Sequence, residues 1–339
     1  MEKVETYSSL KEKGEFFEQT NIKTRDQLDE IIESYKVNEN NILIFRGCKE
    51  AHYKLYNKAQ REWIGKEIYN LGFTFKEFIE NEIKNARNWQ GGLLDKFFMA
   101  FGQPSNDLII LGFLQHYGAP TTLLDWTYSF DNSLFFATDR LKNYESNNEI
   151  DNYFSIYIYN TAYNEFLNYI IALVIDSKIF EHMQPQLSEE AKELKIEDQK
   201  KMNKFYYHDL VGESVSLIPG YNKDGFSYKN EKISFNLFYN QQNLNIINQK
   251  GLFILNASED KPLEYFFRGR SFEDTDNRFY NYPQFKCLNI HKSLLEYSLK
   301  YLNDRTSFPI NKEFIFPQEE LIAKNAYQQA LNFEFKYNE

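Results

Sequence analysis

Residues that could carry chemistry gather in one short segment, residues 116–127, which reads HYGAPTTLLDWT. It combines an imidazole that can exchange a proton near neutral pH with a carboxylate and aromatic rings. Asp125 and Trp126 follow two leucines, which predicts a carboxylate beside a large ring at the end of a short strand. A structural corner is the alternative, with His116 bound to a carbonyl group, Asp125 capping the next helix and Trp126 in the core. The segment alone leaves both interpretations open.

The second candidate is the arginine in Phe45-Arg46-Gly47. It follows the apolar run 42–45, which is typical of a strand buried on both faces, and we expect that strand to stop at Arg46. The guanidinium is a rigid fork that suits phosphate or carboxylate, and Gly47 lets a ligand or another backbone approach closely. We expect Arg46 and Asp125 to meet. If they serve a site rather than the fold, removing either should cost little stability.

Other catalytic and metal-binding patterns are weak or absent. The two cysteines, Cys48 and Cys287, and the five scattered histidines exclude a disulfide framework and a cysteine-rich zinc site, so no metal is expected. The sequence contains no HExxH, GxSxG, GxGxxG or Walker A pattern. Cys48 precedes His52 by one helical turn's spacing, and this pair is a weaker candidate for a thiol nucleophile with a base.

Composition and charge argue against further classes of function. The chain of 339 residues has 39 Lys and Arg against 49 Asp and Glu, a formal net charge of -10. This balance argues against general nucleic-acid binding, although a local basic patch is compatible with it. The 31 Phe and 25 Tyr indicate a folded chain. Because no apolar stretch approaches the ~20 residues of a membrane span and no signal-peptide run is seen, we expect a cytoplasmic protein without membrane contact.

The hydrophobic pattern predicts an α+β fold with a mixed central sheet, flanking helices and a charged insertion. Residues 1–40 are expected to be helical, with a capping box from Thr24 to Gln27. We divide the chain into this segment, a domain over 41–325 with an exposed insertion near 181–204, and a tail over 326–339. Strands are expected over 42–45, 122–126, 153–159, 213–217, 232–239, 251–255, the start of 285–302 and 314–317, and helices over 54–106, 107–115, 131–141, 161–175 and the rest of 285–302.

Several of these segments together resemble the FRG domain family, which is named after a Phe/Tyr-Arg-Gly motif. The resemblance spans about residues 20–325. The central motif is the most specific part, and Arg61 lies where family members often have an arginine. The matching segments are Ile44–Gly47 (IFRG), His116–Thr121 (HYGAPT), Leu123–Thr127 (LLDWT), Ser133–Ala137 (SLFFA), Asn248–Phe253 (NQKGLF) and Phe314–Pro317 (FIFP).

Two positions depart from the family pattern. Thr122 stands where the family usually has an arginine, and Asn245 stands where an arginine often precedes the glutamine element. Both changes remove a cation from the expected site. A phosphate bound there would therefore meet fewer positive charges than in other members.

The order of these motifs is similar to that of ADP-ribosyltransferases, an analogy at the level of the fold. It implies an arginine on the first core strand that holds the pyrophosphate of NAD, with NAD as substrate rather than resident cofactor. Asp125 would stabilise the oxocarbenium ion formed as nicotinamide leaves. The residues implied as catalytic are Arg46, Asp125, His116 and Gln249, and those implied as ligand-binding are Gly47, Tyr117, Gly118, Trp126 and Thr127.

The sequence leaves three functions open. The first is an NAD-consuming transferase or glycohydrolase, which in a family of bacteria and phages implies a toxin or a phage-defence effector. The second is an RNA- or DNA-cleaving toxin that uses His116, Asp125 and Arg46 for acid–base cleavage. The third is a module that binds or senses a nucleotide, a protein target or a regulatory partner. Convergence of the motif side chains on one open cavity would favour catalysis or ligand binding over a purely structural role.

Overall fold

The computed structural model describes seven stretches of the chain, and every structural statement below concerns these residues. They are 4–36, 43–100, 107–160, 215–218, 244–267, 285–304 and 308–331. The predicted strand 232–239, the predicted helix 161–175 and the charged segment 181–204 lie outside them.

A seven-stranded mixed sheet organises the described residues, in the order β1-β7-β4-β2-β3-β6-β5. The edge strand β1 pairs with β7 in parallel, and all other neighbours are antiparallel. The predicted α+β class with a mixed sheet is therefore confirmed. The strands are β1 (Glu18–Ile22), β2 (Leu43–Cys48), β3 (Leu123–Thr127), β4 (Tyr153–Asn160), β5 (Val215–Ile218), β6 (Gly251–Asn256) and β7 (Phe285–His291).

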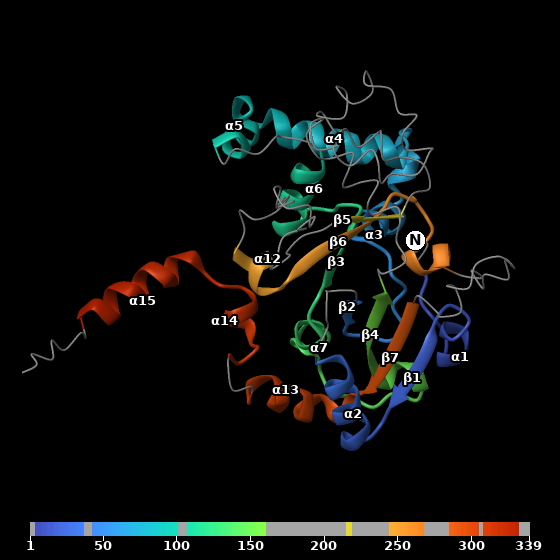
Figure 1. Cartoon of the computed structure of the whole chain (residues 1–339). Coiled ribbons are helices and arrows are strands. Elements are labelled where there is room, and N and C mark those ends of the chain that lie inside the picture. Colours follow the sequence, from blue (N-terminus) through green and yellow to red (C-terminus); the bar gives the residue numbers. More distant parts are fainter. Residues whose placement is uncertain are drawn as a thin grey trace, which may run out of the picture.

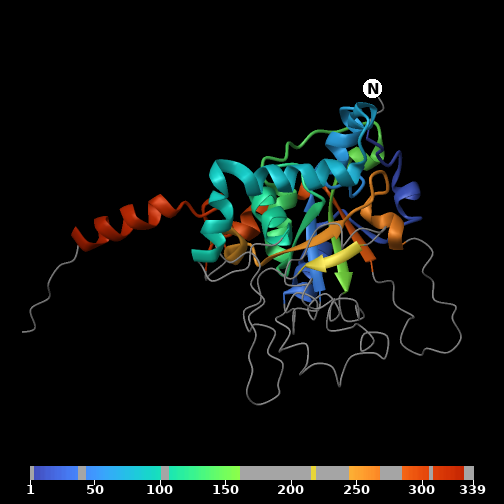
Figure 2. The same ribbon diagram turned by 90° about the horizontal axis from the view of Figure 1, so that it is seen from above.

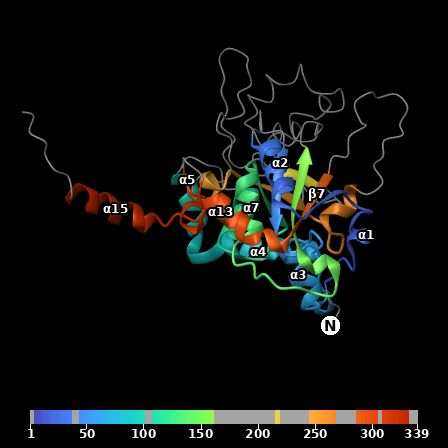
Figure 3. The same ribbon diagram turned by 90° about the horizontal axis from the view of Figure 1, so that it is seen from below.

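Helices flank the sheet in two groups (Figure 1). One group lies beside β3 and β6, and the other lies beside β2, β4 and β7. The turned views show that the last helix extends away from the rest of the structure (Figures 2 and 3). The longer helices are α2 (Arg25–Tyr35), α3 (Lys58–Gly65), α4 (Phe75–Asn88), α5 (Leu93–Ala100), α6 (Asp107–His116), α7 (Phe130–Thr138), α13 (Leu295–Asn303) and α15 (Glu319–Leu331), and the short ones include α1 (Leu10–Lys13), α12 (Leu244–Asn248) and α14 (Lys312–Ile315).

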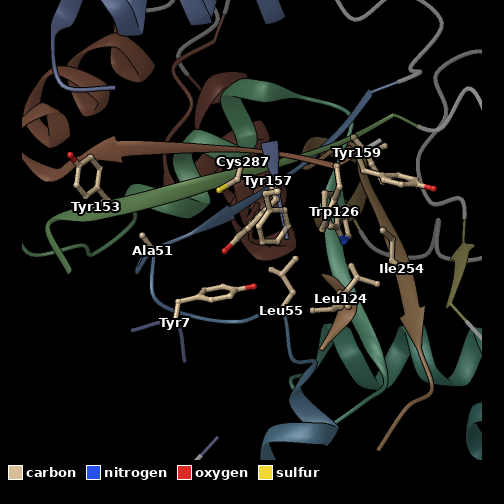
Figure 4. Packing of buried hydrophobic residues seen from close by; sticks show 14 of the residues in the cluster. Tyr7, Ala51, Leu55, Leu124, Trp126, Tyr153, Tyr157, Tyr159, Ile254 and Cys287 are labelled. Carbon is tan, nitrogen blue, oxygen red and sulfur yellow. The ribbon is translucent and has the colours of Figure 1, made fainter. Parts of the chain in front are cut away.

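Three clusters of buried apolar residues pack against the sheet. Leu123 packs with α4, α5 and α6, whereas its neighbour Leu124 packs in a second cluster with aromatic residues of β4 and β7. This is the alternation of a strand, in which successive side chains point to opposite faces. Phe45 belongs to a third cluster with α2, α7 and α13. Figure 4 shows part of the second cluster, to which Trp126 and Tyr157 both belong.

Several sequence predictions are confirmed within the described residues. The capping box at the start of α2 is present, with Thr24 and Gln27 each binding the other's backbone N–H. The strands expected near 122–126, 153–159 and 251–255 form, as does the strand followed by a helix within 285–302. The helix expected over 107–115 forms as α6.

Three predictions of local structure are wrong. Residues 1–40 are not helical throughout, because the polar segment Glu18–Ile22 adds to β7 as the edge strand β1. The first core strand continues past Arg46 to Cys48, because β2 stays paired with β4 along its length. Residues 314–317 do not form a strand, since Asn311 caps the short helix α14 by accepting a hydrogen bond from the Phe314 N–H.

The sheet opens between β2 and β3. These neighbours pair at one position, Phe45 with Thr127, whereas β2 follows β4 from Leu43 to Cys48. Beyond Phe45, the edge of β3 therefore faces β2 without a regular ladder. The backbone groups of β3 at this opening need other partners, because an unpaired buried carbonyl or N–H is costly.

Gly47 lies in β2 directly against the helix that follows β3. A Cβ atom placed on Gly47 would lie 2.0 Å from the Ser133 carbonyl oxygen and 2.6 Å from the Ala137 nitrogen, both in the backbone of α7. Those distances leave no room for a methyl group, and a helix backbone cannot shift alone. The close approach that the sequence predicted for Gly47 is thus to another backbone element.

We expect Gly47→Ala to destabilise the protein by roughly 3 kcal/mol or more, because α7 must move away from β2. The measurement is urea unfolding followed by circular dichroism. Gly65→Ala is the matched control, since a Cβ at Gly65 meets nothing within 4 Å and alanine favours the helix. Equal stability of the two variants would contradict the close packing of α7 on β2.

Helix α4 carries one carboxylate on its packed face. Glu82 lies between Phe78 and Ala86, which pack against the first cluster, and its Oε2 is buried without a hydrogen-bond partner among the described residues. Burial raises the pKa of Glu82 to about 7, partly offset by the positive charge of Lys58. The folded state therefore holds a proton that the unfolded chain releases near pH 4.5.

The contribution of this proton to the free energy of unfolding is complete below about pH 4.5 and falls as the pH rises toward 7. We expect Glu82→Gln to stabilise the protein by about 1–2 kcal/mol at pH 8 and to have little effect at pH 5. Thermal unfolding at both pH values measures this. Glu80→Gln, on the same helix in a surface ion pair with Lys76, is the control. A gain that is the same at both pH values would contradict the buried carboxyl.

Candidate functional site

One open cavity coincides with the predicted site. It lies on the face of β3 and β6 that α5, α6 and α12 border, and the open space within it, including solvent at its mouth, is about 650 Å³. Aromatic rings form much of its wall and polar groups lie among them, which is the usual composition of a small-ligand site. Its lining residues are Phe97, Phe98, Gly112, Phe113, His116, Tyr117, Asp125, Trp126, Ile246, Gln249, Gly251, Leu252 and Phe253.

Asp125 is the exposed position of an otherwise buried strand. Its neighbours along β3 are buried, whereas 58% of its side chain is exposed to solvent. Its Oδ2 accepts a hydrogen bond of 2.8 Å from Gln115 Nε2 and lies 4.0 Å from Arg46 Nη1. A charged group in the middle of a central strand contributes nothing to the core, so its position favours a role at the cavity.

Arg46 bridges the opening between β2 and β3. Its Nη1 donates a hydrogen bond to the backbone carbonyl of Asp125. Asp125 lies in the part of β3 that is not paired with β2. The guanidinium therefore replaces part of the missing ladder, and it also faces the Asp125 carboxylate across 4.0 Å. Arg46 contacts the cavity residue Asp125 without being among the lining residues.

A second arginine lies near this contact. Partial burial, followed by the nearby positive charge of Arg46, lowers the pKa of Arg61, while Asp125 opposes this shift. Arg61 Nη1 donates to the Tyr56 carbonyl at 2.5 Å. Arg46 and Arg61 thus place two positive charges near Asp125 on a chain that is acidic overall.

The His116–Gly118 turn forms the rim of the cavity at the end of α6. Tyr117 is 70% exposed, and its ring centroid lies 4.7 Å from that of Phe113. The His116 ring lies at 4.7 Å from Tyr117 in an edge-on arrangement. Gly118 adopts a φ of 79°, a left-handed conformation that favours glycine, and its carbonyl accepts a hydrogen bond from Lys58.

The other predicted ligand-binding residues have structural contacts. Trp126 borders the cavity, but its ring packs in the second cluster, with its centroid 5.8 Å from that of Phe285. Thr127 is buried and its hydroxyl donates to the Gln249 carbonyl at 2.6 Å. Gln249 lines the cavity, and its Nε2 donates to the Ile315 carbonyl at 3.2 Å.

Sequence reasoning missed Gln115, Thr121 and Lys58. Gln115 looked like the end of an apolar helix and Thr121 like a loop residue, yet both belong to the hydrogen-bond network of Asp125. Lys58 lies in α3, far from the motif in sequence. Two signals were available: Thr121 lies within the His116–Thr127 segment, and Gln115 directly precedes it.

The weaker Cys48–His52 pairing does not form. The Cys48 thiol donates to the Glu50 carbonyl, and burial raises its pKa. His52 Nδ1 lies 2.7 Å from an Asp151 oxygen instead. Among the described residues, no cluster of three or more His, Cys, Asp and Glu side chains could hold a metal ion, and no helix has the length and apolar character to cross a membrane.

Taken together, these residues form an α+β domain in which a mixed sheet opens beside a cavity with a central carboxylate. The model of the FRG domain family matches residues 41–146, so this part of the chain is an FRG domain. The match includes Arg46, Arg61, the His116–Thr127 segment and α7. Neither the curated proteins nor the solved structures contain a match to the chain.

The structure predicts different losses of stability for Arg46→Ala and Asp125→Ala, whereas the sequence predicted similar losses for both. Arg46→Ala should cost about 1–3 kcal/mol, because it leaves a backbone carbonyl in the sheet without its donor. Asp125→Ala should cost less than about 1 kcal/mol, because the carboxylate is largely exposed. Chemical unfolding of both variants measures this, with Arg46→Lys as a control that keeps a donor. Equal stability of Arg46→Ala and wild type would contradict the bridging role.

Proposed function

We propose that this FRG domain protein binds NAD at the Asp125 cavity and cleaves the bond between nicotinamide and ribose. The observation that carries the proposal is a solvent-exposed carboxylate held in the middle of a central strand, inside a cavity with aromatic walls. Such a carboxylate stabilises a positive charge that develops on a sugar ring.

The chemistry follows from the charge on Asp125. The C1′–N bond breaks, its electron pair leaves with nicotinamide, and the ribose carbon becomes an oxocarbenium ion. A water molecule then adds to this carbon and loses a proton, giving ADP-ribose. An acceptor side chain of a target protein could replace water in the same step, which would make the reaction an ADP-ribosyl transfer.

Two further features support NAD as the ligand. The exposed ring of Tyr117 beside Phe113 offers a surface on which a flat heterocycle can stack. Arg46 and Arg61, which lie beside Asp125 rather than in the cavity lining, add positive charge that favours an anionic group such as a pyrophosphate. The order of arginine strand, Asp125 strand and glutamine before β6 also follows the analogy with ADP-ribosyltransferases, in which the effector would act as a toxin or in phage defence.

A second candidate function is a nucleotide-binding sensor without turnover. It is favoured by Gln249, which stands where the ADP-ribosyltransferase analogy has a glutamine- or glutamate-type residue on a third strand. Its side chain is neutral and already donates to the Ile315 carbonyl. Binding without bond cleavage needs the same pocket and the same arginines, so the two functions differ in turnover alone.

The test is incubation of purified protein with NAD, with free nicotinamide measured by chromatography and NAD binding by calorimetry. Asp125→Asn should reduce nicotinamide release by about 10²–10³-fold while the protein stays folded. Asp29→Asn, which changes an exposed carboxylate of α2, is the matched control. Binding with no release would favour the sensor, and neither binding nor release would overturn NAD as the ligand.

A further inference from the structure

The two oxygens of the Asp125 carboxylate have different surroundings. Oδ2 accepts a hydrogen bond from Gln115 Nε2 and is the oxygen that faces Arg46. Oδ1 has no hydrogen-bond or ion-pair partner among the described residues. Because Asp125 lines the cavity and is largely exposed, Oδ1 is the oxygen that a bound ligand can reach.

Gln115 is itself held in place by Thr121. The Thr121 hydroxyl donates a hydrogen bond to Gln115 Oε1, and its oxygen accepts one of 3.3 Å from the Leu123 N–H. Thr121 is fully buried, so this hydroxyl has a fixed environment. Gln115 lies at the end of α6 and Thr121 just before β3, so the pair spans the turn that forms the cavity rim.

The hydrogen bonds define which way the Gln115 amide faces. A carboxylate can only accept hydrogen bonds, so the nitrogen of the amide must face Asp125. The oxygen of the amide then faces Thr121, whose single proton is free to be donated because its oxygen already serves the Leu123 N–H. Each group thus has one role, and a flipped amide would place two acceptors against each other.

We propose that Gln115 and Thr121 are positioning residues that hold Asp125 by Oδ2 and so present Oδ1 to the ligand. This inference rests on the proposed function for its catalytic meaning, but the contact itself can be tested separately. Without the pair, the exposed carboxylate would sample several rotamers, and a misplaced group loses most of its effect on a transition state. Binding of the substrate would change less, because the cavity walls and the arginines stay in place.

The contact is tested by the side-chain amide resonances of Gln115 in an NMR spectrum of the ¹⁵N-labelled protein. A hydrogen bond to a carboxylate shifts the bonded amide proton away from the position of a free amide. We expect this shift in wild type, its loss in Asp125→Ala and a marked change in Thr121→Val. If the Gln115 amide protons of the wild-type protein have the chemical shifts of a free amide, the proposal is overturned.

The consequence for catalysis is tested by steady-state kinetics of nicotinamide release. Thr121→Val keeps the size of the side chain but removes the hydroxyl, and should lower kcat by about 10–100-fold with KM changed less than about threefold. Gln115→Met should behave in the same way. Thr121→Ser restores the hydroxyl and should recover most of the wild-type kcat. Thr138→Val is the matched control, because the Thr138 hydroxyl donates within α7, to the Leu134 carbonyl.

The outcomes separate this inference from the proposed function. Nicotinamide release that Thr121→Val and Gln115→Met leave unchanged would overturn the positioning role while the proposed function stands. A wild-type protein that releases no nicotinamide would overturn the proposed reaction, and the NMR measurement would still decide whether Gln115 holds Asp125. If melting temperatures show that Thr121→Val is unfolded, the partly exposed Gln115→Met variant carries the kinetic test.

Discussion

The contact between the Arg46 guanidinium and the Asp125 backbone carbonyl joins β2 and β3 beyond their one paired position. β2 and β3 pair at Phe45 and Thr127 and are not paired at Arg46 and Asp125. A side chain that bridges such a gap keeps the backbone carbonyl satisfied without closing the strands on each other. Two parts of the core can then pack against one sheet. One contains α7 and α13, and the other contains α4, α5 and α6.

The opening also explains why a charged residue is tolerated in a central strand. A carboxylate under packed helices would lose its hydration without compensation. At Asp125 the helices α5, α6 and α12 leave a cavity, and Gln115 and Arg46 supply a donor and a positive charge. The same arrangement that solves this structural problem leaves one carboxylate oxygen exposed in an aromatic pocket. The structural role and the candidate functional role of Asp125 are therefore linked, because both depend on its contacts with Gln115 and Arg46.

The high aromatic content is used in two different ways. Most rings of the second cluster, such as Tyr157 and Phe285, are buried and fix the layer opposite the cavity. Tyr117 and Phe97 instead remain partly exposed at the cavity rim. Trp126 shows how one residue of a motif can join both regions, because it borders the cavity while its ring packs in the core. The structural-corner interpretation thus holds for Trp126, and the cavity interpretation fits its neighbour Asp125.

The sequence by itself determined the features that depend on local pattern. The α+β class, the capping box of α2, the apolar strands and the FRG motifs could be read directly, because periodicity and capping act between residues close in the chain. The polar edge strand β1 could not, because its partner β7 lies more than two hundred residues away in the sequence. Tertiary structure alone decided that Arg46 binds a backbone carbonyl, that Gly47 meets α7, and that Gln115 and Thr121 hold Asp125. The first two depend on segments far apart in the sequence meeting at the opening in the sheet, which no local pattern encodes. The third joins residues close in sequence, but the direction of each side chain depends on how α6 packs against β3.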